Sequence, residues 1–152
     1  MKPDEPDVIA ASEVIYRRAP RIPHPQWTVV DQGTKAMYVT LAALKWDEDG
    51  ISCYRKGILV DHDLEWPAVK RSPEHGVFSL LVSNVRHHGL GAAFDPWPPE
   101  DEPHPSDVAH SLIVDCGMPS KETKSARTKL GRTAVIVHTG SPSEPGIVDG
   151  PV

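Results

Sequence analysis

The sequence predicts a single α+β domain, with a mostly antiparallel or mixed sheet of about five strands and one or two helices on one face. Three observations lead to this prediction. Strand-like apolar runs outnumber helix-like segments and follow one another along the chain, rather than alternating with helices. No strand-like run is followed by the glycine-rich phosphate loop of a nucleotide-binding unit. The length of 152 residues is that of one domain.

Composition and charge argue against several classes of function and location. The net charge of −5 at pH 7 argues mildly against a dedicated nucleic-acid binder. No apolar stretch approaches the roughly 20 residues that a membrane-spanning helix needs, so no membrane association is expected. The first residues lack the basic region and the apolar run of a signal peptide, and the expected location is therefore the cytoplasm.

The chain divides into three predicted parts. Residues 1–25 are rich in acids and prolines and predict an N-terminal arm, with a short helix over 8–18. Residues 26–138 form the single α+β domain. Residues 139–152 are rich in Gly, Pro and Ser and predict a disordered tail.

The first half of the domain predicts a short strand over 27–30 and then a hairpin. The run 34–46 fits a helical stripe and a strand alternation equally well, and both stay open. A short acidic turn joins it to the alternating run 51–56, and this arrangement favours strand over helix. Gly57 then marks a bulge, after which residues 58–60 continue the strand.

The second half of the domain predicts a strand on either side of a long loop. Ser120 and Gly131 are a good N-cap and a good C-cap for the helix that follows. In chain order, the expected elements are a helical turn near 64–69, strands over 77–85 and 111–116, a helix over 121–130 and a strand over 132–138.

Cys53 and Cys116 each lie in an apolar, strand-like run. Neither belongs to a C-x-x-C motif or to the spacing of a zinc site. Buried free thiols in a reducing compartment are the favoured interpretation, because cysteine is among the most buried residue types. A disulfide between paired strands is the alternative.

The loop over 95–107 is the most unusual segment of the sequence, because it is long, acidic and rich in proline. Loops of this length in compact domains are usually functional or disordered. Its prolines favour an extended conformation that displays Trp97 as a lid or a contact surface. Asp95 begins the loop, and Arg86 and His88 precede it. Together with Trp97, these three residues are predicted to bind the ligand.

Asp107 and His110 suggest general-base chemistry at the end of this loop. An aspartate three residues before a histidine can orient the imidazole by accepting its N–H. The histidine then serves as a base near neutral pH. Possible serine nucleophiles lie nearby, although none of them sits in a G-x-S-x-G elbow, and these are Ser83, Ser106 and Ser111.

Arg55 is the third predicted catalytic residue. It alternates with Ile51 and Cys53, so it points into the protein if that side of the strand is buried. A buried guanidinium needs a partner, either an acid such as Asp95 or an anionic ligand. We therefore expect neighbouring strands to bring Arg55, Arg86 and His110 together beneath the loop.

The stretch from Tyr54 to Gly57, with Tyr-Arg followed closely by Gly on an early strand, is similar to the start of ADP-ribosyltransferase domains. The resemblance implies that Arg55 helps to hold a nicotinamide dinucleotide. It covers these few residues, and the later serine-threonine-serine or tyrosine of that family and its terminal glutamate find no counterpart on this chain. The resemblance thus suggests an alternative function, a transferase or glycohydrolase that acts on a nucleotide through Arg55 and His110.

Histidines and carboxylates are also good ligands for zinc. A metal-assisted hydrolase built on His88, His104 and His110 is therefore a further alternative. No pair of these histidines has the i, i+4 spacing that points two ligands the same way on a helix, so solvated histidines are the preferred interpretation and no metal site is predicted.

The leading functional hypothesis is a small cytoplasmic binding or accessory module. Its acidic loop 95–107 and the Arg/His cluster at the base of the loop would bind a protein partner or a small polar ligand. No complete catalytic constellation is evident, so the sequence leaves open whether the protein is an enzyme, and it indicates no cofactor. The basic residues of 121–132 suggest weak anion or nucleic-acid binding, although a solvated helix face is the favoured interpretation.

Overall fold

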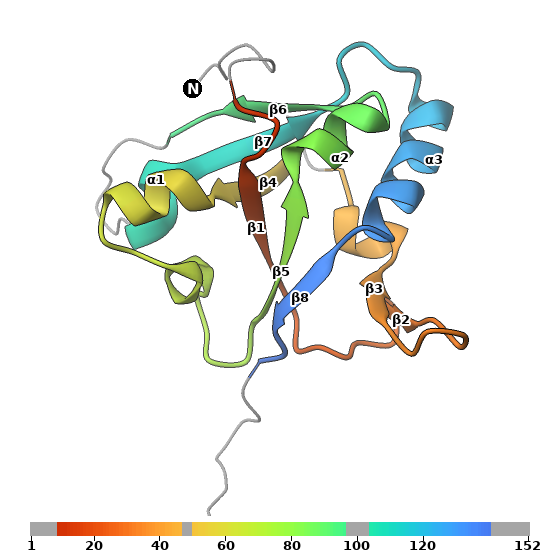
Figure 1. Ribbon diagram of the computed structural model, residues 1–152, viewed down its shortest axis with the longest axis horizontal. Helices are drawn as coiled ribbons and strands as arrows, with labels where there is room; N and C mark the ends of the chain where they lie inside the picture. The colour runs from red at the N-terminus through yellow and green to blue at the C-terminus, as the bar shows by residue number, and fades with distance from the viewer. Residues whose placement is uncertain (1–8, 47–49, 97–103, 141–152) are drawn as a thin grey trace, which may run out of the picture.

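The computed structural model describes residues 9–46, 50–96 and 104–140, and the account that follows concerns these residues. Their centre is a six-stranded antiparallel sheet with the strand order β6-β7-β4-β1-β5-β8, and a small separate hairpin lies beside it (Figure 1). The strands of the large sheet are β1 (Val14–Ala19), β4 (Ile51–Arg55), β5 (Gly76–Leu81), β6 (Gly91–Phe94), β7 (His110–Val114) and β8 (Val135–His138). The predicted single α+β domain with an antiparallel sheet is therefore confirmed.

The strand register assigns each side chain to one of two faces, because directly opposed residues of paired strands point the same way. Tyr16 opposes Tyr54, and Tyr54 opposes His110. Ile15 opposes Arg55, one residue along from Tyr16 and Tyr54. We call the side that carries Tyr16, Tyr54 and His110 the His110 face, and the side that carries Ile15 and Arg55 the α3 face.

The α3 face holds the larger apolar core. Helices α2 (Val82–His87) and α3 (Ser120–Gly131) pack on it together with the 3-10 turn η1 (Leu41–Leu44) and the hairpin of β2 (Thr28–Val30) and β3 (Met37–Val39). Phe78 and Leu130 have no exposed surface in this core. Burial of one such side chain stabilises the fold by about 1.5–3 kcal/mol. Gly131 ends α3 against the hairpin, where an added Cβ would lie 2.4 Å from the main-chain oxygen of Val39.

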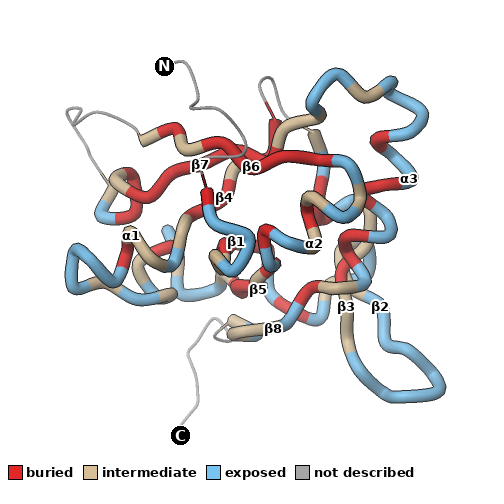
Figure 2. The backbone as a smooth tube through the Cα atoms, turned by 45° about the horizontal axis from the view of Figure 1, so that its top comes forward, coloured by how far each residue is buried: buried red, intermediate tan, exposed pale blue. Residues whose placement is uncertain are grey.

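The His110 face holds a smaller apolar cluster and more polar groups. It is covered by helix α1 (Lys56–Asp61) and by the 3-10 turns η2 (Trp66–Val69) and η3 (Pro105–Ala109). The apolar cluster consists of Tyr16, Tyr54, Leu59, Val69, Val77 and Ala109. Figure 2 shows β6 and β7, which flank the loop at 95–107, as mostly buried backbone.

Several predicted elements are confirmed. The expected strands over 27–30 and 132–138 correspond to β2 and β8, and the expected turn near 64–69 to η2. Helix α3 is one residue longer at each end than the predicted 121–130, so that Pro119 and Arg132 take the cap positions expected for Ser120 and Gly131. Within the described ranges, no helix combines the length and the apolarity that crossing a bilayer requires.

The predicted helix over 8–18 is wrong, because residues 14–19 form β1 in the middle of the sheet. Buried residues occur on both sides of this segment, with Ile15 and Ala19 on the α3 face and Tyr16 on the His110 face. This is the period of two that a central strand needs. β1 thus belongs to the sheet, although it lies in the segment predicted as an N-terminal arm.

The predicted hairpin between the runs 34–46 and 51–56 is also wrong. The first run forms β3 and then η1, and β3 pairs with β2. β4 pairs with β1 and β7 instead. The expected bulge at Gly57 and the strand over 58–60 are replaced by α1, which begins at Lys56 directly after β4.

The strand predicted over 77–85 ends earlier, at Leu81, and continues as α2. Val82 and Val85 are spaced by three residues and are both buried, which suits a helix on the apolar core. β6 was missed because its sequence, Gly-Ala-Ala-Phe, lacks the β-branched residues typical of strands. The strand predicted over 111–116 is β7, which begins one residue earlier and ends at Val114.

Both cysteines are free. Cys53 is buried as expected, and burial raises the pKa of its thiol to about 12. Cys116 is exposed in the turn after β7 and has a positive φ of 53°, so the predicted burial of this thiol is wrong. The predicted disordered tail lies outside the described residues except for 139–140, as does most of the loop 95–107.

Candidate functional site

His110 is the first residue of β7 and is only 1% exposed. Its Nδ1 lies 2.9 Å from the main-chain oxygen of Asp95, a group that can only accept a hydrogen bond. Nδ1 must therefore carry the proton. Burial lowers the pKa of His110, so the ring is neutral at pH 7 and Nε2 is an acceptor.

Ser52 is the hydrogen-bond partner of the acceptor nitrogen of this imidazole. Its Oγ lies 3.0 Å from His110 Nε2, and the hydroxyl donates because Nε2 carries a lone pair in this tautomer. Ser52 is part of β4, two residues before Tyr54, and so shares the His110 face. A serine hydroxyl that donates to a neutral histidine has the hydrogen-bond polarity of a nucleophile next to a general base.

Asp95 directly follows β6 and is 5% exposed. Its main-chain N–H donates to the carbonyl oxygen of His110 at 3.0 Å, which fixes the two residues against each other. Its carboxylate Oδ2 lies 3.6 Å from His110 Nδ1. The other oxygen, Oδ1, is buried and has no hydrogen-bond partner among the described residues.

Arg18 and Tyr54 form the next layer of this site. The Tyr54 ring meets the His110 ring edge-on, with the ring centroids 5.6 Å apart. Arg18 hydrogen-bonds to the Tyr54 hydroxyl, and its Nε donates to the main-chain oxygen of Val69 at 2.9 Å. Burial lowers the pKa of Arg18, but a guanidinium remains charged throughout the usual pH range.

Asp107 and His104 belong to η3 and its N-cap. Asp107 Oδ2 accepts a hydrogen bond from the main-chain N–H of His104 at 2.9 Å, and Asp107 Oδ1 lies 3.5 Å from the Arg71 guanidinium. His104 Nε2 donates to the main-chain oxygen of Lys70 at 3.0 Å, and its Nδ1 accepts a hydrogen bond from Ser106. His104 Nε2 thus links η3 to the end of η2, whereas His104 Nδ1 caps η3 itself.

Three of the predicted site residues, His110, Asp95 and Asp107, therefore lie on the same face. The charges of Asp95, Asp107 and Arg18 all act on the pKa of His110, the two carboxylates raising it and Arg18 lowering it. Asp107 was expected to orient His110, but Asp95 makes the direct contacts with the imidazole. We call Arg18, Ser52, Tyr54, Asp95 and His110 the histidine cluster.

Arg55 lies on the α3 face and not beside His110, so the predicted convergence of the two is wrong. The register pairs His110 with Tyr54, and the neighbouring side chain of Arg55 points the other way. Arg55 does need a carboxylate, as expected, but the partner is Glu13 at 3.3 Å and not Asp95. Its guanidinium also lies 5.0 Å from the centre of the Phe94 ring.

Two further residues predicted to bind the ligand, Arg86 and His88, do not join the cluster. Arg86 belongs to α2 and hydrogen-bonds to the main-chain oxygen of Ile9. His88 caps the C-terminus of α2 on the α3 side, where it lines a surface hollow with Met118 and Lys129. Trp97 lies outside the described residues.

The metal-site alternative finds no assembled ligand set in the part of the chain that the structure describes. No group of three or more His, Cys, Asp or Glu side chains is placed there to hold an ion. His88 belongs to the α3 side, whereas His104 and His110 lie on the other side of the sheet.

Sequence reasoning missed Arg18, Ser52 and Tyr54. Each lies on a strand in alternation with buried apolar residues, which is the signal that could have grouped them on one face. The alternation does not show which strands are neighbours, and it is the pairing of β4 with β1 and with β7 that brings the three residues to His110.

Comparison of the chain with protein-family models, with curated proteins and with solved structures finds no match. A function must therefore be argued from the chemistry of the site, since function resides in sites and not in fold classes. The histidine cluster offers two features for that argument, the unsatisfied oxygen of Asp95 and the hydroxyl of Ser52 that donates to His110.

Proposed function

We propose that the protein is a small cytoplasmic binding module, and that it takes up a hydrogen-bond donor of a protein partner or polar ligand at the base of the loop 95–107. The observation that carries this proposal is the buried Oδ1 of Asp95, which has no hydrogen-bond partner among the described residues. A buried carboxylate oxygen that lacks a partner is costly, so a donor that reaches it gains free energy on binding.

The placement of a second carboxylate supports this proposal. Asp107 Oδ1 is also buried and without a hydrogen-bond partner in the described part of the chain, although it lies near Arg71. Asp95 and Asp107 stand at the two ends of the loop that the sequence singles out. Two carboxylates favour a cationic donor, such as the ammonium of a lysine or the guanidinium of an arginine.

A titration followed by NMR tests this proposal. The amide signals of Asp95 and His110 are recorded while N-acetyl-arginine amide or N-acetyl-lysine amide is added, with the neutral N-acetyl-citrulline amide as the matched probe. We expect saturable shifts with the cationic probes. Asp95→Asn keeps the shape and removes the charge, so it should abolish these shifts, whereas Asp61→Asn on the exposed side of α1 should not. Equal shifts with the citrulline probe, or in Asp95→Asn, would contradict the proposal.

The Ser52–His110 hydrogen bond favours a second candidate function, the hydrolysis of an ester or a similar acyl compound. In the proposed reaction, Ser52 Oγ attacks the carbonyl carbon while its proton passes to His110 Nε2. The leaving alkoxide takes that proton, and a water molecule then releases the acyl group from Ser52 by the same two steps. The Nδ1–H bond to the Asp95 carbonyl keeps Nε2 available as the base.

Hydrolysis of p-nitrophenyl acetate and labelling by a fluorophosphonate test this second function. Both should occur in the native protein and be lost in Ser52→Ala. Ser79→Ala is the matched control, because Ser79 lies on the same face two strands away from Ser52. Labelling that persists in Ser52→Ala would exclude Ser52 as the nucleophile.

A further inference from the structure

A surface cavity of about 490 Å³ lies at the end of β1 and shares Arg18 with the histidine cluster. Ligand pockets typically measure about 300–1,000 Å³, so this cavity has the volume of a small-molecule site. In Figure 1 the end of β1 and the start of β5 lie together at the lower edge of the sheet. The cavity is lined by Arg18, Ala19, Pro20, Arg21, Trp27, Glu74 and His75.

Arg18 lines this cavity, and its guanidinium is held in place by two hydrogen bonds. The bonds to Val69 and Tyr54 use two of its five N–H groups, which leaves three for other acceptors. A guanidinium that is fixed before the ligand arrives loses little freedom on binding, and its planar fork fits a phosphate or a carboxylate. Arg18 is thus a preorganised anion-binding group.

Arg21 adds a second guanidinium to the same cavity. It follows Arg18 by three residues, and Pro20 stiffens the backbone between the two. Arg21 is exposed, so it lies at the rim and can close on a bound anion from the solvent side. Two arginines that line one hollow are a common arrangement for recognition of phosphate groups.

The charged side chains that line the cavity are Arg18, Arg21 and Glu74, so the lining has a net positive charge. The pKa of His75 is lowered, first by burial and then by the charges of Arg18 and Lys70, with a smaller contribution from Arg71. Glu74 is the acid among the lining residues and opposes this shift only in part. An anionic group is therefore favoured here over a cation, in contrast to the carboxylate site at Asp95.

Trp27 supplies an aromatic wall. Its ring is half-buried, meets His24 edge-on with centroids 6.3 Å apart, and has the Arg17 guanidinium 5.9 Å from its centre. These contacts hold the indole in place. An indole lining a hollow is a surface on which a flat ring such as a nucleobase can stack.

From these observations we infer that the cavity at the end of β1 binds an anion joined to a planar ring, with Arg18 and Arg21 holding the anionic group and Trp27 contacting the ring. This site is separate from the donor site proposed at Asp95. Arg18 belongs to both surroundings, because it bonds to Tyr54 in the histidine cluster and also lines the cavity.

Isothermal titration calorimetry with adenosine monophosphate as the probe tests the inference. Adenosine and inorganic phosphate are titrated at the same ionic strength as separate arms. We expect the monophosphate to bind more tightly than either part alone. Arg21→Ala should weaken its binding about tenfold or more, because a charge-assisted hydrogen bond is worth about 1.5–3 kcal/mol. Arg21 is exposed, so this variant should fold normally.

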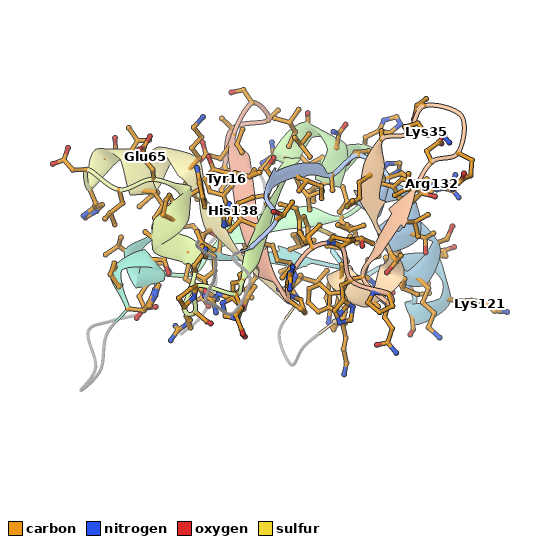
Figure 3. The ribbon with its side chains drawn as sticks, turned by 90° about the horizontal axis from the view of Figure 1, so that it is seen from below. Tyr16, Lys35, Glu65, Lys121, Arg132 and His138 are labelled. Atoms are coloured by element: carbon orange, nitrogen blue, oxygen red, sulfur yellow. The ribbon has the colours of Figure 1, made fainter. Side chains whose placement is uncertain are left out.

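Two further variants make the test specific. Trp27→Leu should weaken the monophosphate and leave binding of inorganic phosphate unchanged, with the melting temperature recorded because Trp27 also packs on the core. Arg132→Ala should bind the monophosphate like the native protein, since Arg132 lines a different hollow with Lys124 and Lys129 and lies away from Tyr16 of β1 in Figure 3.

Several results would overturn the inference. Absence of binding at millimolar monophosphate, or equal binding by Arg21→Ala, would remove the site. Phosphate alone binding as tightly as the monophosphate would remove the role of the ring, and adenosine alone doing so would remove the role of the anion. Asp95→Asn should leave monophosphate binding intact, so failure of this site and failure of the donor site are separate outcomes.

Discussion

The two faces of the sheet treat their polar groups differently. On the α3 face, the charged side chains of Arg55 and Arg127 have partners. Arg55 forms an ion pair with Glu13, and Arg127 donates a hydrogen bond to the main-chain oxygen of Leu44. On the His110 face, Arg18 and Asp107 also have partners, but the hydrogen bonding of the buried polar groups is incomplete in the described part of the chain. The buried side-chain polar atoms that lack a hydrogen-bond partner in the described part of the chain belong to Asp95, Asp107 and His138, and all three residues lie on this face.

This difference suggests separate roles for the two faces, with stability on one and ligand binding proposed for the other. A face that is apolar and fully paired contributes stability, and the α3 face has the larger core to do so. A face that keeps buried acceptors unpaired gives up stability, and such positions are typical of binding and catalytic sites. We therefore attribute stability mainly to the α3 face and propose the His110 face as the place of ligand recognition.

Phe78→Ala should have the largest effect on the free energy of unfolding, because it disrupts the core on the α3 face. Phe78 is fully buried in the larger core, and truncation of a buried phenylalanine costs about 3–5 kcal/mol through lost contacts and the cavity that is left. Urea denaturation should show this loss in the free energy of unfolding. A loss below about 1 kcal/mol would mean that the core on this face is not the main source of stability.

Arg127→Met should have the next largest effect. The substitution keeps much of the volume of the side chain but removes the donor that lies 3.0 Å from the Leu44 carbonyl oxygen. A carbonyl left without its donor costs about 1–3 kcal/mol. Thermal unfolding compared with Lys129→Met, an exposed change on the same helix, should show the loss in Arg127→Met alone.

Stability should fall as the pH drops below about 6.5, the ordinary pKa of histidine, because burial lowers the pKa of His110. The unfolded chain then binds a proton that the folded state resists, so the free energy of unfolding decreases until the pH passes below the pKa of the folded protein. His104 and His75 have lowered pKa values for the same main reason and act in the same direction.

His110→Gln isolates the contribution of the cluster to this pH dependence. The variant should have a flatter stability profile between pH 7 and 5 than the native protein, measured by urea denaturation at each pH. His24→Gln, a substitution of a less buried histidine, is measured alongside as the control for the change of side chain. An unchanged slope in His110→Gln would mean that His110 does not resist protonation in the folded protein.

The difference between the faces also explains what the sequence could predict. α3 and β8 follow from local signals, namely cap residues and a run of β-branched residues. β1 was mistaken for a helix because Arg17 and Arg18 interrupt its apolar alternation, and their partners are far away in the chain, at Ala43 and Val69. Such long-range bonds leave no local signal.

The residues of the site also differ in how far local sequence predicts them. His110 and Asp95 were predicted from their position beside an unusual loop, which is a local feature of the chain. The assignment of Ser52 to His110, and the separation of Arg55 from it, depend on which residue of β4 lies opposite His110. A shift of one residue in that register would exchange the two faces. Sequence patterns alone do not fix this register, because β4 and β7 carry buried residues on both sides.

Asp95→Asn should have the smallest effect on stability. The sign of its change in the free energy of unfolding tests whether the two faces differ. The substitution removes a buried negative charge whose Oδ1 is unpaired in the described part of the chain, while it keeps the main-chain contacts with His110. The free energy of unfolding should therefore change by less than about 1 kcal/mol or increase, in contrast to the loss in Arg127→Met. Denaturation of both variants at pH 7 makes the comparison. A loss in Asp95→Asn as large as that in Arg127→Met would show that the carboxylate stabilises the fold, and the division of roles between the faces would then fail.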